Sequence, residues 1–312
     1  MIKGYLLGMG IRGILSCIAV MGLLLGGVGC SRVSIMYRFA GPFVVTAIDK
    51  YFDLDSTQAE KTRTLVDKEL KGLVQHQIPH VNESLREYLR LVKNPDLTRA
   101  QYDAFADRAR DKFLAALPQL EGSVKEFTAS LTPRQMEHYG KIALENLRKE
   151  EERLKSSAGR EKQLRQRISF GYDLVGLELN AAQKEQFARF LAESKYPFEL
   201  EIRNRERTIR KFLEAAKKPD TRDAFLHEIL HHPLRFRDDA YRKAYEEYRQ
   251  ISHSFQHRLI RSFTEAQQIR IERKVRDLIQ QLEELRRAEG FACPSPCGSP
   301  MTSSLARIAS RR

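Results

Sequence analysis

The sequence lacks the signatures of several common enzyme classes. It has no Ser, His and Asp in a recognisable hydrolase arrangement, no glycine-rich loop that would cradle phosphate, and no dinucleotide-binding fingerprint. Runs of β-branched residues in strict alternation are scarce between residues 56 and 289, which argues against a β-sheet. Only four of the 312 residues are cysteine. Charge and helical periodicity are what the chain has in abundance.

The periodicity predicts an all-α fold. In two segments the apolar residues follow the spacing of a single helix face. These residues are Met136, Tyr139, Ala143 and Leu147 in the first segment, and Ile271, Val275, Leu278, Leu282 and Leu285 in the second. Prolines stand where helices would start or stop, at Pro79, Pro95, Pro118, Pro133, Pro219 and Pro233.

A recurring five-residue phrase marks five predicted helix starts. It consists of an apolar residue, a capping residue, two free positions and Gln. An Asp, Thr or Asn at the N-cap accepts hydrogen bonds from free backbone N–H groups, and the Gln reaches back to the N-cap amide. The phrase occurs at Leu54-Asp55-x-x-Gln58, Leu97-Thr98-x-x-Gln101, Leu131-Thr132-x-x-Gln135, Leu179-Asn180-x-x-Gln183 and Phe263-Thr264-x-x-Gln267.

The same phrases indicate an internal duplication. The repeats are separated by 125 residues between Gln58 and Gln183, 124 between Pro95 and Pro219, and 132 between Gln135 and Gln267. Two tandem helical units explain this spacing if the second has a short insertion near His231-His232-Pro233. A chance recurrence of helix caps is the alternative.

The predicted organisation therefore has two helical units, at residues 56–175 and 176–289. We expect them to form an elongated bundle or array. The tail at 290–312 is rich in Pro, Ser and Arg, and it has too little apolar surface to offset the entropy of ordering, so we predict that it is disordered.

The first 29 residues form a predicted signal peptide. Lys3 and Arg12 are their only charges, and Gly13–Val28 is an uncharged apolar run of about sixteen residues, which is short for a membrane span. The run ends in Gly27-Val28-Gly29-Cys30-Ser31, which resembles the bacterial lipobox, with Gly27 where Leu is usual. The resemblance implies that Cys30 receives a diacylglyceryl thioether and becomes the mature N-terminus. An ordinary signal peptide or an uncleaved anchor is the alternative.

The remaining chain is basic. Removing the first 29 of 312 residues takes away Lys3 and Arg12, so that 283 residues with a net charge of +11 remain. Acyl chains would hold this protein stably at a membrane, and by resemblance to lipoprotein sorting rules Ser31 directs it to the periplasmic face of the outer membrane. We expect no nucleic acid there, and we expect lipopolysaccharide, another anionic envelope component or an unfolded polypeptide as the partner. A basic surface that only maintains solubility is the alternative.

Residues 30–55 connect the lipidated N-terminus to the first helical unit. They are dense in apolar side chains, and Pro42 is placed to be the first residue of a helix. This segment would either lie on the bilayer as an apolar linker or dock onto the core.

One motif suggests catalysis. His227-Glu228-Ile229-Leu230-His231 matches the H-E-x-x-H pattern, in which two histidines on one helix face bind Zn²⁺ while the Glu polarises water. Pro233 would end the helix almost at the second histidine, and no Gly-x-x-His extension follows. Glu246-Glu247 lies where some zinc hydrolases place a third ligand. A zinc-dependent hydrolase or a metal-binding protein, with Glu228 as the candidate catalytic residue, is therefore our alternative hypothesis.

The other candidate ligands are weaker. His253 and His257 are also spaced i, i+4 and would extend a metal site to four histidines, with a surface or helix-end position as the alternative. His76 and His80 flank Pro79 and predict a turn. Cys293 and Cys297 would be able to form a disulfide in an oxidising compartment.

Two resemblances follow from these residues. The stretch Cys30-Ser31 through Tyr37 and Ile48–Gln58, with the later Leu-Thr-x-x-Gln starts, resembles an uncharacterised family of Gram-negative periplasmic lipoproteins that is known only as a domain of unknown function. The Leu-Thr-x-x-Gln phrase is also similar to that of the periplasmic chaperones Spy and CpxP. Together they imply a helical envelope protein. Our main hypothesis is a non-enzymatic binding or chaperone-like protein with no cofactor.

Mass spectrometry of the mature N-terminus tests the predicted anchor. We expect a diacylglyceryl-modified Cys30 as the first residue, because the lipobox directs modification of that thiol before cleavage. An unmodified N-terminus at any other residue would contradict the prediction.

Overall fold

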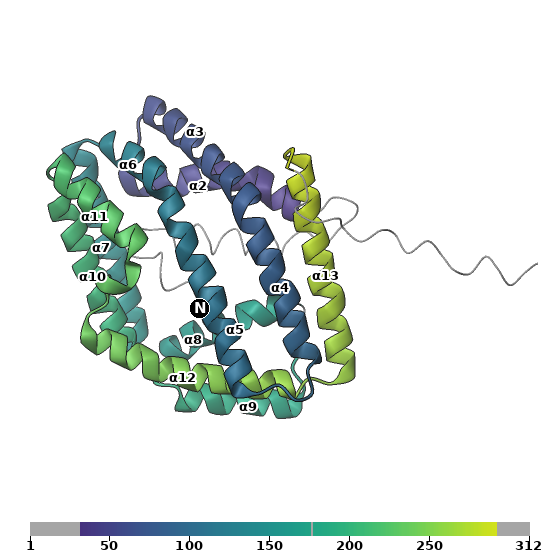
Figure 1. Cartoon of the computed structure of the whole chain (residues 1–312). Helices are drawn as coiled ribbons and strands as arrows, with labels where there is room; N and C mark the ends of the chain where they lie inside the picture. The colour runs from purple at the N-terminus through teal and green to yellow at the C-terminus, as the bar shows by residue number, and fades with distance from the viewer. Residues whose placement is uncertain (1–31, 176, 292–312) are drawn as a thin grey trace, which may run out of the picture.

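The protein is all α-helical, as predicted. The computed structural model describes residues 32–175 and 177–291, and within these residues it contains no β-strand (Figure 1). The α-helices are α2 (Arg32–Phe52), α3 (Ser56–Gly72), α4 (Ile78–Lys93), α5 (Arg99–Ala116), α6 (Glu121–Ala129), α7 (Pro133–Lys155), α8 (Ser157–Leu174), α9 (Ala181–Glu193), α10 (Phe198–Ala215), α11 (Pro219–His231), α12 (Asp239–Arg261) and α13 (Glu265–Ala288). Short π and 3₁₀ segments occur at Leu73–Gln77, Leu117–Leu120 and Pro233–Phe236.

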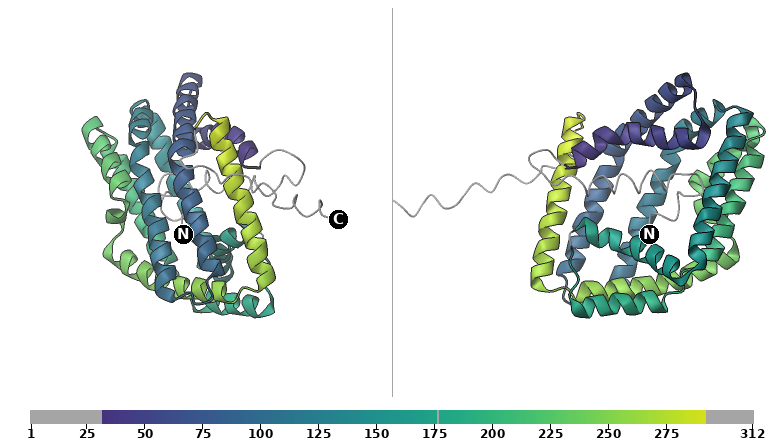
Figure 2. Two further views of the ribbon diagram at one scale, coloured as in Figure 1. Left: turned by 45° about the vertical axis from the view of Figure 1, so that its right-hand side comes forward. Right: turned by 180° about the vertical axis from the view of Figure 1, so that it is seen from behind.

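The helices follow the sides of a rectangular frame. In Figure 1, α9 and α12 run along the bottom, α7, α10 and α11 stand on one side, and α4 and α13 stand on the other. The view from behind in Figure 2 shows α2 closing the top of the frame. The main buried cluster includes residues from Phe52 to Val275 and is rich in aromatic rings, and a smaller second cluster consists of Val74, Ile78 and Leu285. Tyr139 of α7 is fully buried there, between Phe52 of α2 and Phe212 of α10.

All five predicted N-caps are confirmed. Asp55, Thr98, Thr132, Asn180 and Thr264 have extended backbones, and each side chain accepts a hydrogen bond from the backbone N–H of the Gln three residues later. Each Gln side chain in turn accepts from the N-cap amide. These helices begin where they do because a local side chain satisfies N–H groups that have no partner within the helix.

Four of the five glutamines have a second role, which ties the helix starts together in pairs. Gln183 Nε2 donates to the Ser262 carbonyl (2.9 Å) and to Gln267 Oε1 (3.0 Å). Gln267 Nε2 donates to the Glu178 carbonyl and to Gln183 Oε1, both at 2.8 Å. Each amide thus reaches the residue two positions before the N-cap of the other helix.

The first half contains the same arrangement. Gln58 Nε2 donates to the Ser130 carbonyl (2.7 Å) and Gln135 Nε2 to the Asp53 carbonyl (3.0 Å). The two side-chain amides also bond to each other. Ser130 and Asp53 again lie two residues before the opposite N-cap, so the two halves repeat one set of polar contacts.

Packing between the halves is also repeated. α4 and α7 of the first half correspond in order and spacing to α10 and α13 of the second. α10 packs against α7, and α13 packs against α4. At Gly140 of α7, a Cβ would lie 2.8 Å from Leu213 Cδ1 of α10, so any larger residue would require the Leu213 side chain to shift. Each half therefore packs two of its helices against two helices of the other half.

Two proline-based predictions were wrong. Pro42 lies inside α2 and does not begin it, because α2 is held along its length by α3, α7 and α13. Pro79 lies in the first turn of α4, as predicted, but the chain does not turn there. A π segment connects α3 to α4, and the Ile78 N–H bonds to the Leu73 carbonyl five residues back. The wider turn shifts the carbonyl that the Pro79 ring would otherwise strike, so the helix continues past His76 and His80.

The glutamine pairs can be tested separately from the caps. Gln183→Glu keeps the acceptor needed for the capping box but removes the donor, and it places a carboxylate against the Ser262 carbonyl. We expect the free energy of unfolding to fall by about 2 kcal/mol or more. Chemical denaturation measures this change.

Gln101→Glu is the matched control, because the exposed Gln101 serves its own cap and has no glutamine partner across the fold. We expect its effect to stay within about 0.5 kcal/mol. Equal losses in the two variants would show that the cross-helix bonds contribute nothing.

Candidate functional site

The two histidines of the H-E-x-x-H motif share one face of α11. His227 and His231 lie one turn apart near the end of the helix, and their rings stack with centroids 4.1 Å apart. Their side chains are 49% and 32% exposed, so the site is open to solvent. This part of the motif has the geometry expected from its spacing.

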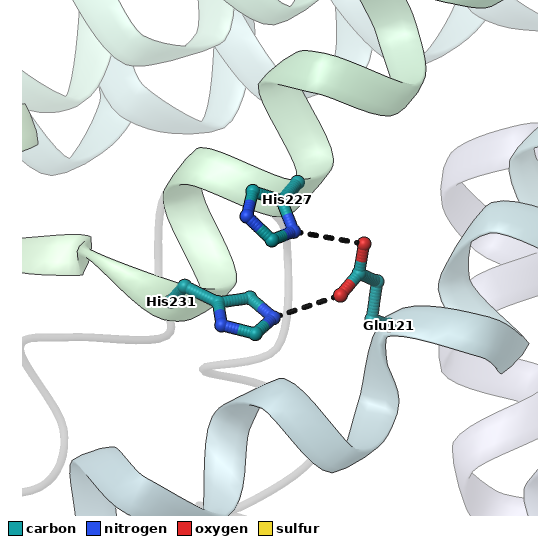
Figure 3. A group of neighbouring side chains, drawn as sticks. All are labelled: Glu121, His227 and His231. Atoms are coloured by element: carbon teal, nitrogen blue, oxygen red, sulfur yellow. Dashed lines mark hydrogen bonds and ion pairs between the residues drawn. The ribbon is translucent and has the colours of Figure 1, made fainter.

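The third member of the cluster is Glu121, the first residue of α6. His227 Nδ1 lies 3.1 Å from Glu121 Oε1, and His231 Nε2 lies 2.8 Å from Oε2 (Figure 3). α6 packs against α11, which brings together residues that are 106 positions apart in the chain. One nitrogen from each ring and one carboxylate oxygen lie within 4.8 Å of one another, and among the described residues this is the one such group of His, Cys, Asp or Glu.

Glu121 is held as a carboxylate by the hydrogen-bond donors around it. Hydrogen bonds from Lys125, then His231 and His227, lower the pKa of Glu121 to about 2. Lys125 Nζ, one turn further along α6, lies 2.7 Å from Glu121 Oε1. A carboxylate that stays ionised is what a metal ligand requires.

Glu228 points away from this cluster. Its Oε2 lies 3.4 Å from Arg235 Nη1, and its side chain is 46% exposed. Glu246, which the spacing suggested as a third ligand, bonds instead to Arg249 and Gln250. The arrangement is therefore two imidazoles and one carboxylate, with the motif's own glutamate engaged elsewhere.

His253 and His257 do not join His227 and His231. His253 is buried on α12, and its Nδ1 lies 2.8 Å from Asp103 Oδ1 of α5. Burial lowers its pKa, although the bond to Asp103 acts in the opposite direction. His257 Nε2 donates to the Leu97 carbonyl at 2.8 Å.

The two histidine–carboxylate contacts occupy equivalent places in the repeat. The spacing of 124 that relates Pro95 to Pro219 also relates Asp103 to His227, and the spacing of 132 that relates Gln135 to Gln267 also relates Glu121 to His253. A histidine–carboxylate contact is thus made at both equivalent places, and the position that holds the carboxylate in one copy holds the histidine in the other. Only the copy on α6 and α11 has a second histidine at the carboxylate.

A basic groove lies between α4 and α13 on the opposite side of the frame. It has a volume of about 610 Å³ and includes the apolar side chains Leu89 and Ile279. Its basic residues are Arg86, Arg90, Lys93, Arg276 and Arg287, and its acidic residues are Glu272 and Glu283. The groove therefore has an excess of three positive charges.

The acidic residues of the groove are already paired. Glu272 bonds to Lys93 (2.6 Å) and Arg276 (2.8 Å), and Glu283 accepts a hydrogen bond from the buried Asn82. Arg86 and Arg90 are exposed and form no ion pair with any described residue. These two guanidinium groups are available to an anionic ligand.

Several predicted sites lie outside the described residues. Cys30 and Ser31 precede Arg32, and Cys293 and Cys297 follow Phe291. The predicted disordered tail also lies almost wholly beyond that point. Within residues 32–175 and 177–291, no helix has both the length and the apolarity needed to span a bilayer.

Comparison with known protein families gave a match. The model of a family of unknown function, DUF6279, matches residues 50–242, which is more than half of the 312 residues. The chain belongs to the DUF6279 family. No curated protein and no solved structure matches the sequence at a significant level. The DUF6279 match includes Glu121, His227 and His231, while α13 lies outside it.

This membership confirms the predicted relationship to an uncharacterised family. The lipoprotein anchor and the likeness to Spy and CpxP stay predictions. Sequence reasoning found both histidines of the DUF6279 protein's cluster but missed Glu121, because nothing in its local sequence points to a partner 106 residues away.

Acidification tests the charge state of Glu121. Because the folded-state pKa is about 2, against 4.5 ordinarily, Glu121 contributes stability above pH 4.5 and loses it as the pH falls toward 2. We expect Glu121→Gln to be less stable than the wild type at pH 6, with the difference shrinking between pH 4.5 and pH 3. Thermal melts across this range measure it, and a difference that stays constant would contradict the assignment.

Proposed function

We propose that the protein is a non-enzymatic lipoprotein, anchored through Cys30 at the periplasmic face of the outer membrane, that binds anionic, phosphate-bearing lipid headgroups. The observation that supports this function best is the basic groove between α4 and α13. Arginine is suited to such ligands, because its planar guanidinium bonds two phosphate oxygens at once. Leu89 and Ile279 add apolar surface for the region next to the headgroup.

The position of α2 supports the same function. Its first described residue, Arg32, is two residues from Cys30, so a lipid anchor at Cys30 would be joined to α2 by a very short linker. The Val33 N–H donates to Gln281 Oε1 of α13 at 3.3 Å. Gln280, the neighbour of Gln281, is part of the groove wall. A lipidated Cys30 would therefore hold one end of the groove close to the bilayer surface.

The free energy that the basic side chains contribute to membrane binding can be estimated. A basic side chain near an anionic leaflet contributes about 1 kcal/mol at physiological ionic strength. Arg86 and Arg90 lie one turn apart on α4 and face the groove. Hydrolysis is not part of the proposal, because the carboxylate of Glu228 is directed to Arg235.

Vesicle co-sedimentation tests this function. The chain from Ser31 onward, without lipid, should bind vesicles containing phosphatidylglycerol better than vesicles of phosphatidylcholine alone, and added salt should weaken the binding. Arg86→Gln combined with Arg90→Gln should lower the affinity about thirtyfold, which corresponds to two lost contributions of about 1 kcal/mol.

Arg203→Gln combined with Lys211→Gln is the matched control. Both residues are exposed on α10, on the other side of the frame, and the double variant has the same net charge (Figure 1). An equal loss of binding in both double variants would contradict the groove. Suppression of client aggregation without any vesicle binding would point to an unfolded polypeptide as the partner.

A further inference from the structure

The Glu121, His227 and His231 cluster has the composition of a metal site. Two imidazoles and one carboxylate form a ligand set that proteins use for Zn²⁺, with the fourth position left to water. The same set also binds Cu²⁺ and Ni²⁺, whereas Mg²⁺ and Ca²⁺ prefer oxygen ligands alone. We propose that Glu121, His227 and His231 bind one zinc ion between α6 and α11.

The distances fit this proposal. In a tetrahedral zinc site with bonds of about 2.0–2.1 Å, neighbouring donor atoms are about 3.3 Å apart. His227 Nδ1 lies 3.1 Å from Glu121 Oε1 and His231 Nε2 lies 2.8 Å from Glu121 Oε2, and one nitrogen from each ring and a single carboxylate oxygen lie within 4.8 Å of one another. Small rotations of the three side chains, all of which are partly exposed, would bring two nitrogens and one oxygen to the spacing of a zinc site.

Proton positions are also consistent with binding. A ring nitrogen that binds a metal has no proton, so neutral His227 must carry its proton on Nε2 and neutral His231 on Nδ1. One oxygen of Glu121 then binds the ion, while the other keeps its hydrogen bond from Lys125, which supports the ligand from outside the site.

The bound ion would join the two halves of the molecule. Glu121 belongs to the first half, and both histidines belong to the second. The equivalent contact between Asp103 and His253 joins the halves through a single buried histidine. The inference is metal binding without hydrolysis, and it does not depend on the proposed lipid-binding function.

Zinc binding to the full-length protein, purified in detergent and stripped with a chelator, tests the inference. Isothermal titration should give one Zn²⁺ per chain, and Mg²⁺ should give no heat of binding. Zinc at one hundred times its dissociation constant should raise the melting temperature by about 5 °C.

Variants assign the ligands. His227→Ala, His231→Ala and Glu121→Gln should each weaken zinc binding at least tenfold, since removal of even a supporting partner costs about that much. Glu228→Gln is the matched control on the same helix turn and should bind zinc as the wild type does. Circular dichroism checks that every variant keeps its helices.

Two results of the zinc titrations would overturn the inference. One is a wild-type protein that takes up no stoichiometric zinc. The other is a loss of affinity in Glu228→Gln as large as that in the three ligand variants. Cobalt substitution provides a second measurement on the unaltered protein, because intense visible absorption indicates the expected tetrahedral site, and the weak absorption of the hydrated ion would also overturn it.

Discussion

The fold depends on how four helix starts are held in pairs. A helix start has free N–H groups, and a capping box satisfies them locally. Here Gln58, Gln135, Gln183 and Gln267 use the amide oxygen for the cap and the amide nitrogen for the opposite helix. A glutamate would serve the first purpose and not the second. The choice of glutamine therefore converts a local capping signal into a tertiary contact.

The local parts of this architecture could be predicted from sequence. The five capping boxes form as expected, because each depends on residues within one helical turn. The all-α class follows from periodicity for the same reason. The prolines show the limit of this reasoning. Packing of α2 against three helices outweighs the preference of Pro42, and a π turn accommodates Pro79.

Contacts between distant segments could not be predicted. The histidine pair is visible as i, i+4 spacing, but Glu121 reaches it only because α6 packs on α11. The sequence contains a weak signal of the glutamine pairs, since all five phrases have Gln at a position where capping boxes also accept Glu. The sequence contains no such signal of the basic groove, because α4 and α13 are separated by most of the chain.

The packing of helices between the halves also affects the order in which contacts form as the chain is synthesised. α4 is complete at Lys93, but its partner α13 starts at Glu265, about 170 residues later. Contacts of such long sequence separation are slow to form. The contact between α4 and α13 therefore forms only after nearly all of the chain has been synthesised, whereas α2, α3 and α7 already have partners within the first half.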